Sequence, residues 1–225
     1  MAAPARPDAP ERMRRWPTPC LMLITDRTRL RGRRLEEVAS LAVDGGATVV
    51  QLREKDLPGG ELYELAITLR AALRGRALLL VNDRVDVALA AGADGVHLPE
   101  HSLPGRAVRE MAGEGCIVGR SVHSVEAALH AEEQGADFVE VGAVYETASK
   151  PGVTPAGVEL VRAVARAVRV PVVAVGGVGA ENVAETIEAG ADGVAVIGAV
   201  MDADDPKRAA GRLRRALDDA YAALS

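Results

Sequence analysis

The residues best suited to chemistry in this 225-residue sequence form short polar clusters, each directly after an apolar run. One cluster contains Gln51, Arg53 and Lys55, which alternate with other residues and so share one face of an extended backbone. An amide and two cations facing the same way form a predicted anion-binding site. Glu54 alternates to the opposite face, so we do not expect it to neutralise these cations.

A second group of residues is suited to binding phosphate. Hydroxyls and a lysine follow the sixth apolar run, and glycines follow the seventh and eighth runs. Glycine lets backbone N–H groups approach an anion closely, and late loops of this kind bind phosphate in many α/β barrels. We expect this phosphate site to contain Thr147, Ser149, Lys150, Gly177, Ile197 and Gly198.

The third candidate feature is a histidine that could transfer protons. His123 lies two residues beyond Ser121, so both are expected to face the same way at the end of the fifth run. A histidine titrates near neutral pH and can act as both acid and base. His97 is similarly placed on the fourth run and is its nearest competitor. The alternative is that His123 only hydrogen bonds to a neighbouring loop.

The elements that must position these residues are eight apolar runs separated by amphipathic stretches. Near-continuous apolar runs are typical of parallel strands covered on both sides. A Gly-Ala-Asp or Gly-Ala-Thr turn ends the preceding helix at Gly46, Gly92, Gly135 and Gly190, which indicates a repeated βα unit. Eight such units predict a single (β/α)8 TIM barrel, with an open doubly wound sheet as the alternative. The predicted strands are 21–26, 48–54, 77–83, 95–99, 117–122, 138–144, 171–177 and 193–198.

Composition sets the limits of this fold. We expect the barrel to occupy residues 20–225, after a proline-rich and charged arm over residues 1–19 that we expect to be disordered. The net charge of −5 and an aromatic content of 2% argue against nucleic acid as a partner. The sequence has neither an apolar run long enough for a membrane span nor a secretory signal. Cys20 and Cys116 lack metal-ligand spacing and are expected to be buried in a cytoplasmic protein.

Taken together, the strand ends resemble those of the thiamine phosphate synthase family. Synthases of this family join an aminopyrimidine diphosphate to a thiazole phosphate and release pyrophosphate, with Mg²⁺. The resemblance implies that Gln51, Arg53, Lys55 and Asn82 bind the diphosphate substrate, that Asp83 binds Mg²⁺, and that Ser121, Thr147, Ser149 and Lys150 surround the reacting groups. The matching segments are Thr25-Asp26-Arg27, Gln51-Leu52-Arg53-Glu54-Lys55, Asn82-Asp83-Arg84, Gly95-Val96-His97-Leu98, Ser121-Val122-His123-Ser124, Thr147-Ala148-Ser149-Lys150 and Gly176-Gly177.

One segment departs from the synthase pattern. Ser102 stands where synthases carry their second Mg²⁺ carboxylate, and a serine hydroxyl is a poor replacement for a carboxylate. This departure, with Leu98-Pro99 and Glu146-Thr147, resembles a sister group, the thiazole tautomerases, which aromatise a carboxylated thiazole phosphate. In that group the histidine matching His123 is the proton shuttle, and the reaction needs no cofactor.

The sequence-based interpretation ranks three functions. A tautomerase with His123, Ser121 and Lys150 as catalytic residues comes first. A synthase with Mg²⁺ held by Asp83 comes second, and a catalytically silent protein that binds thiazole phosphate comes third. In each case the expected partner is a small phosphorylated thiazole, without nucleic acid or membrane, and a homo-oligomer is left open.

Overall fold

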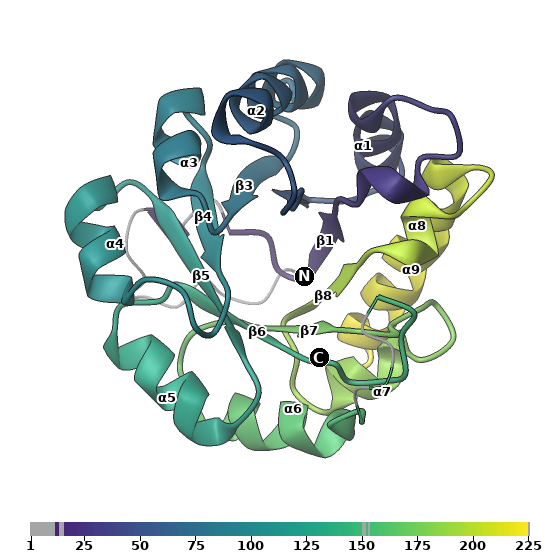
Figure 1. Ribbon diagram of the computed structural model, residues 1–225. Helices are drawn as coiled ribbons and strands as arrows, with labels where there is room; N and C mark the ends of the chain where they lie inside the picture. Colours follow the sequence, from purple (N-terminus) through teal and green to yellow (C-terminus); the bar gives the residue numbers. More distant parts are fainter. Residues whose placement is uncertain (1–11, 14–15, 150–151, 153, 225) are drawn as a thin grey trace.

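The computed structural model of the protein describes residues 12–13, 16–149, 152 and 154–224. Its strands form one closed barrel in which each strand pairs in parallel with the next, and β8 closes onto β1 (Figure 1). This confirms the predicted TIM barrel, although most strands end one to three residues earlier than the sequence pattern suggests. The strands are β1 (Cys20–Ile24), β2 (Val49–Leu52), β3 (Leu78–Asn82), β4 (Gly95–Leu98), β5 (Ile117–Val122), β6 (Phe138–Val141), β7 (Val172–Val175) and β8 (Gly193–Val196).

Helices surround this ring of strands, and the long last helix packs against the first helix and the seventh (Figure 1). Within the described residues they are the 3-10 helix η2 (Arg27–Arg29) and the α-helices α1 (Leu35–Asp44), α2 (Gly59–Leu73), α3 (Val85–Ala91), α4 (Gly105–Ala112), α5 (Val125–Glu133), α6 (Gly157–Ala167), α7 (Val183–Glu188), α8 (Gly198–Met201) and α9 (Pro206–Ala222).

The repeated Gly-Ala-Asp turn fixes the start of the strands. Each of its four glycines has a positive φ, which glycine adopts without the steric penalty of a side chain. The polar residue two positions later then accepts a hydrogen bond from the first part of the preceding strand. Asp94 accepts from the backbone N–H of Leu79, and Asp192 accepts from that of Val172, both at 2.9 Å. Asp137 and Thr48 do the same for β5 and β1, so one sequence device anchors four strands.

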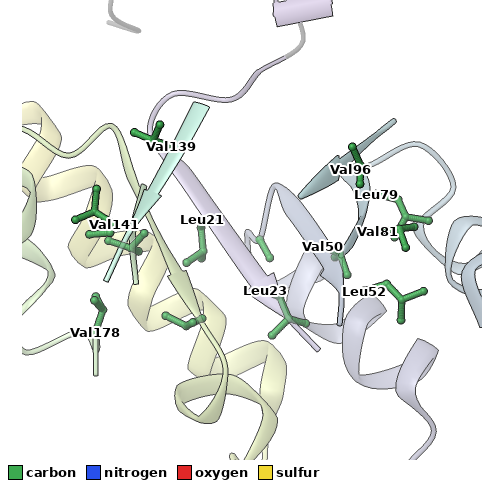
Figure 2. Packing of buried hydrophobic residues seen from close by; sticks show 14 of the residues in the cluster. Leu21, Leu23, Val50, Leu52, Leu79, Val81, Val96, Val139, Val141 and Val178 are labelled. Carbon is green, nitrogen blue, oxygen red and sulfur yellow. The ribbon is translucent and has the colours of Figure 1, made fainter. Parts of the chain in front are cut away.

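Alternation along the strands creates two separate apolar cores. Outward-facing residues such as Leu21, Val50 and Val139 pack against the helices, as Figure 2 shows for part of this cluster. Inward-facing residues form a smaller cluster inside the barrel, which includes Met22, Leu80 and Phe138. Above this inner cluster, toward the carboxyl ends of the strands, the inward positions become polar. The fold therefore places its polar interior where barrels carry their active sites.

The end of the predicted arm is packed rather than disordered where the structure describes it. Trp16 is only 8% exposed, and its ring stacks on Phe138 with 4.3 Å between ring centroids. Arg12 pairs with the buried carboxylate of Asp137 at 2.7 Å. The physical reason is that burying a large aromatic ring over the open end of the barrel is favourable. This free energy outweighs the tendency of a proline-rich, charged segment to stay disordered. Residues 1–11, 14 and 15 lie outside the described residues, so the prediction stands untested there.

Both cysteines are buried and carry free thiols, and burial raises the pKa of Cys20 to about 12. Among the helices of the described residues, none has the length and apolar character needed to cross a bilayer.

Candidate active site

A cavity of about 720 Å³ opens at the carboxyl ends of the strands. A cavity of this size can hold one or two small organic phosphates. It brings together most of the residues singled out from the sequence, although these lie on six different strands or strand ends. The predicted site residues in its wall are Gln51, Arg53, Lys55, Asn82, Ser121, His123, Thr147, Ser149, Gly177, Ile197 and Gly198.

The cationic end of β2 is held in place by a buried carboxylate. Glu54 is 6% exposed and accepts a hydrogen bond from the Thr25 hydroxyl at 2.7 Å. The same hydroxyl accepts from the backbone N–H of Arg53 at 2.9 Å, while Arg27 donates its backbone N–H to Glu54. Glu54 therefore pairs with groups at the end of β1, on the side away from the cavity, and leaves the Arg53 side chain directed at the cavity.

Asn82 and Asp83 follow β3 at the edge of the site. Asn82 is buried in the cavity wall, whereas Asp83 is exposed and lies outside that wall. Asp83 has a φ of +63°, a left-handed conformation that non-glycine residues adopt mainly at special positions. Its carboxylate accepts a hydrogen bond from the hydroxyl of Ser102. The residue that departs from the synthase pattern is thus in direct contact with the expected metal ligand.

The floor of the cavity is a polar cluster inside the barrel. His97 and Glu140 are almost fully buried, and His97 Nε2 lies 2.8 Å from Ser121 Oγ and 3.8 Å from Glu140 Oε1. Gln51 reaches across to donate its amide N–H to Glu140 Oε2 at 3.4 Å. Burial lowers the pKa of His97, and the positive charge of Arg53 lowers it further, against an opposing effect of Glu140. The lowered pKa favours the neutral form of the His97 imidazole.

His123 lies at the mouth of the cavity, separate from this cluster. Its side chain is 43% exposed, and its Nδ1 is 2.6 Å from the carboxylate of Glu100. Ser121 and His123 do line the same cavity, but their hydrogen-bond partners differ.

The predicted phosphate end of the cavity is formed by the loops after β6, β7 and β8. Gly177 has a φ of +69°, and a Cβ placed on it would collide with the carbonyl oxygen of Glu146. Two cations that the sequence analysis does not single out, Arg29 and Arg212, also line the cavity. Arg29 is held by Asp26 at 3.0 Å and Asp202 at 2.7 Å. Lys150 lies outside the described residues, and its role stays a prediction.

Some lining residues were missed for identifiable reasons. Glu140 carries a clear sequence signal, because an acidic residue in the buried run Phe138-Val139-Glu140-Val141 needs a reason to be there. Arg29 and Arg212 carry no such signal, since they reach the cavity from η2 and from α9.

A protein-family model described as thiamine monophosphate synthase matches residues 21–200. A thiamine-phosphate synthase from Haloquadratum walsbyi is 45% identical over 203 residues, covering 88% of this chain and 91% of the relative. One from Pyrococcus horikoshii is 45% identical over 202 residues, covering 88% and 95%.

Solved structures give a consistent result. A thiamine phosphate pyrophosphorylase from Pyrococcus furiosus is 42% identical, with a TM-score of 0.82, over 89% of this chain and 96% of the other. A 3-hexulose-6-phosphate synthase, at 22% identity and a TM-score of 0.69, shares the fold alone.

Proposed function

The chain belongs to the thiamine monophosphate synthase family, and on this premise we propose that it is a thiamine phosphate synthase. It would join an aminopyrimidine diphosphate to a thiazole phosphate and release pyrophosphate. This reverses the order in which the sequence analysis ranked the two reactions. The tautomerase interpretation finds no support among the relatives described above, which are named as synthases or as a pyrophosphorylase.

One observation carries the proposal, namely that a single cavity has two ends suited to phosphate groups. Arg53 and Lys55 lie in its wall at the end of β2, while Gly177 and Gly198 lie in it at the ends of β7 and β8. A synthase must hold two phosphorylated molecules at once, whereas a tautomerase holds one. The cavity volume of about 720 Å³ is compatible with two such ligands.

The chemistry requires charge stabilisation more than proton transfer. The bond between the pyrimidine methylene carbon and the diphosphate oxygen breaks, and pyrophosphate leaves with the electron pair. The thiazole nitrogen forms the new bond to the same carbon and becomes a thiazolium. Arg53, Lys55 and the Ser121 hydroxyl are suited to stabilising negative charge that grows on the leaving group. The serine and threonine of the β6 loop, Thr147 and Ser149, add hydroxyl donors.

The residues present are compatible with the Mg²⁺ that the family implies. Mg²⁺ in phosphate sites is held by one or two carboxylates together with substrate oxygens. A carboxylate and a serine or threonine hydroxyl together hold Mg²⁺ in P-loop enzymes. Asp83 and Ser102, already in contact, are such a pair and would hold the ion. When bound, the ion would neutralise part of the diphosphate charge.

The decisive experiment supplies the pure protein with aminopyrimidine diphosphate, thiazole phosphate and Mg²⁺, and measures thiamine phosphate and pyrophosphate. Equal amounts of the two products support a synthase. A parallel sample receives the carboxylated, non-aromatic thiazole phosphate, and aromatisation there without coupling in the first sample would contradict the proposal. Arg53→Met should abolish most coupling, whereas Arg34→Met, an exposed arginine at the start of α1, is the matched control.

A further inference from the structure

We infer that Glu140 is a positioning residue, which acts through His97 to make the Ser121 hydroxyl a hydrogen-bond donor toward the cavity. Glu140 lies on β6 directly beside Ser121 on β5, because the strand register pairs these two residues. His97 bridges them from β4 through its Nε2 atom. Glu140 is not among the site residues predicted from the sequence.

The first step concerns the side of the imidazole ring that faces away from Ser121. His97 Nδ1 is buried and has no hydrogen-bond partner within the described residues. Phe138 lies beside the ring, with 5.7 Å between centroids, and Gly119 lies against Nδ1. A proton on Nδ1 would be a buried donor without an acceptor, which is a costly arrangement.

The second step concerns the opposite nitrogen. Nε2 faces two oxygen atoms, of which one belongs to a carboxylate 3.8 Å away. A negative charge at this distance attracts an N–H group and repels a lone pair. Both observations therefore favour the same tautomer, with the proton on Nε2. In the neutral imidazole with this tautomer, Nδ1 carries the lone pair and needs no acceptor.

The direction of the short hydrogen bond follows from this tautomer. His97 Nε2–H donates to Ser121 Oγ across 2.8 Å, so His97 cannot also accept the serine proton. Within the described residues, this hydroxyl has its hydrogen bond with His97, and Ser121 lines the cavity. The hydroxyl hydrogen is thus free to point at a ligand.

This polarity is the reverse of a serine nucleophile paired with a histidine base, in which the serine donates to the histidine. Ser121 would instead donate to a ligand oxygen acceptor. That the acceptor is an oxygen of the departing diphosphate rests on the proposed function. The tautomer of His97 does not rest on it, because it follows from the protein alone.

Nuclear magnetic resonance of the full chain labelled with ¹⁵N-histidine tests the inference without substrate. The sequence has four histidines, and a His97→Gln variant identifies the signals of His97. We expect a protonated Nε2 and a bare Nδ1 at neutral pH. In Glu140→Gln the preference should weaken, with a measurable fraction of the proton on Nδ1. Glu100→Gln is the matched control, since it removes the carboxylate next to His123 and should leave His97 unchanged.

Two results would overturn the inference: a proton on Nδ1 in the unaltered protein, or an unchanged His97 tautomer in Glu140→Gln. Glu140→Met, which has similar volume and no charge, serves as a second variant if Glu140→Gln does not fold. A kinetic measurement complements this test. In Glu140→Gln we expect a lower kcat for coupling with KM nearly unchanged, which is the pattern of a group that acts in the transition state. Absence of coupling in the unaltered protein would refute the proposed function, while the tautomer measurement would still decide the inference.

Discussion

The imidazole of His123 and the carboxylate of Glu100 form a close pair at the mouth of the candidate active-site cavity, with 2.6 Å between Nδ1 and Oε2. Both residues line the cavity, and the His123 side chain is 43% exposed, whereas His97 in the cluster with Ser121 and Glu140 is 1% exposed. The pair is therefore placed to contact a ligand near the solvent rather than to assist at the cavity floor.

This location leads to the first prediction, which separates the two reactions by one substitution. His123→Gln should keep more than a tenth of the coupling rate, because forming the new C–N bond needs no proton transfer. A proton shuttle would lose about 10²–10⁴-fold instead. Steady-state coupling kinetics measure the effect, and Ser121→Ala, expected to lose about 10²-fold or more, shows that the assay detects a real loss. A loss at His123 as large as that at Ser121 would contradict the prediction.

The second prediction concerns the phosphate end of the cavity. Gly177→Val forces a branched residue into a left-handed conformation and against the carbonyl of Glu146, so the loop must move. Such strain costs on the order of 1–3 kcal/mol, and thiazole phosphate affinity should fall by about 10-fold or more. Calorimetry with thiazole phosphate measures this.

Gly113→Val is the control for that experiment. Gly113 also has a positive φ, of 72°, but a Cβ there meets nothing within 4 Å, and the residue lies outside the cavity wall. We expect Gly113→Val to lower stability without lowering affinity. Equal affinities for the two variants would remove Gly177 from the phosphate site.

The third prediction concerns Mg²⁺. If the proposed function is correct, coupling should stop in EDTA and return with Mg²⁺, because the ion would neutralise charge on the leaving diphosphate and would be held by Asp83 and Ser102 together with that group. Ser102→Ala should raise the Mg²⁺ concentration needed for half-maximal coupling, and Ser102→Asp should lower it. Calorimetric titration of Mg²⁺ in the presence of pyrophosphate should rank the Mg²⁺ affinities of the unaltered protein and the two variants in the same order, independently of turnover. Full coupling in EDTA would be inconsistent with a metal at Asp83.

The fourth prediction is a pH dependence of stability that originates at His97. Its pKa in the folded protein lies below the ordinary value of 6.5, mainly because the ring is buried. The unfolded chain therefore binds this proton more readily than the folded protein, and stability falls as pH drops below about 6.5. Above about pH 6.5 the contribution of neutral His97 to the free energy of unfolding is fully present. Urea unfolding of the unaltered protein and of His97→Asn at several pH values should show a shallower decline for the variant below pH 6.5, whatever its stability at neutral pH. If the free energy of unfolding fell equally with pH in both proteins, the loss of stability would come from groups other than His97.

The sequence predicted the barrel well because its signals are local and repeated. The turn glycines Gly92 and Gly190 and the aspartates that follow them occur at fixed offsets, and each copy anchors a strand in the same way. The convergence of Gln51, Arg53 and Lys55 on one cavity was also predictable, since alternation along an extended backbone directs them to one face, while their roles stay predictions. Strand ends were overestimated because the predicted strands included polar or glycine residues beyond the observed ends, such as Thr25-Asp26, Arg53-Glu54 and Gly176-Gly177.

The remaining features depend on contacts between distant segments. Trp16 sits in a proline-rich, charged segment whose composition favours disorder, and its burial depends on Phe138, more than a hundred residues away. The pairing of Glu100 with His123 depends on the path of the loop after β4. The Asp83–Ser102 contact has the same origin. The sequence shows that Ser102 is not a carboxylate, but not that its hydroxyl reaches the carboxylate of Asp83.

The stacked pair of Trp16 and Phe138 at the base of the barrel allows the protein to be studied by its intrinsic fluorescence. Trp16 is the single tryptophan of the sequence and Phe138 its single phenylalanine, and Phe138 in turn lies against the imidazole of His97. Tryptophan emission therefore originates from one site. Phe138 and His97 lie between this site and the cavity in which we expect the ligands to bind. A change in that emission on adding substrate would report how rigidly the two ends of the barrel are linked. A shortened chain that begins at Cys20 would lose both the fluorophore and the cover over the inner core.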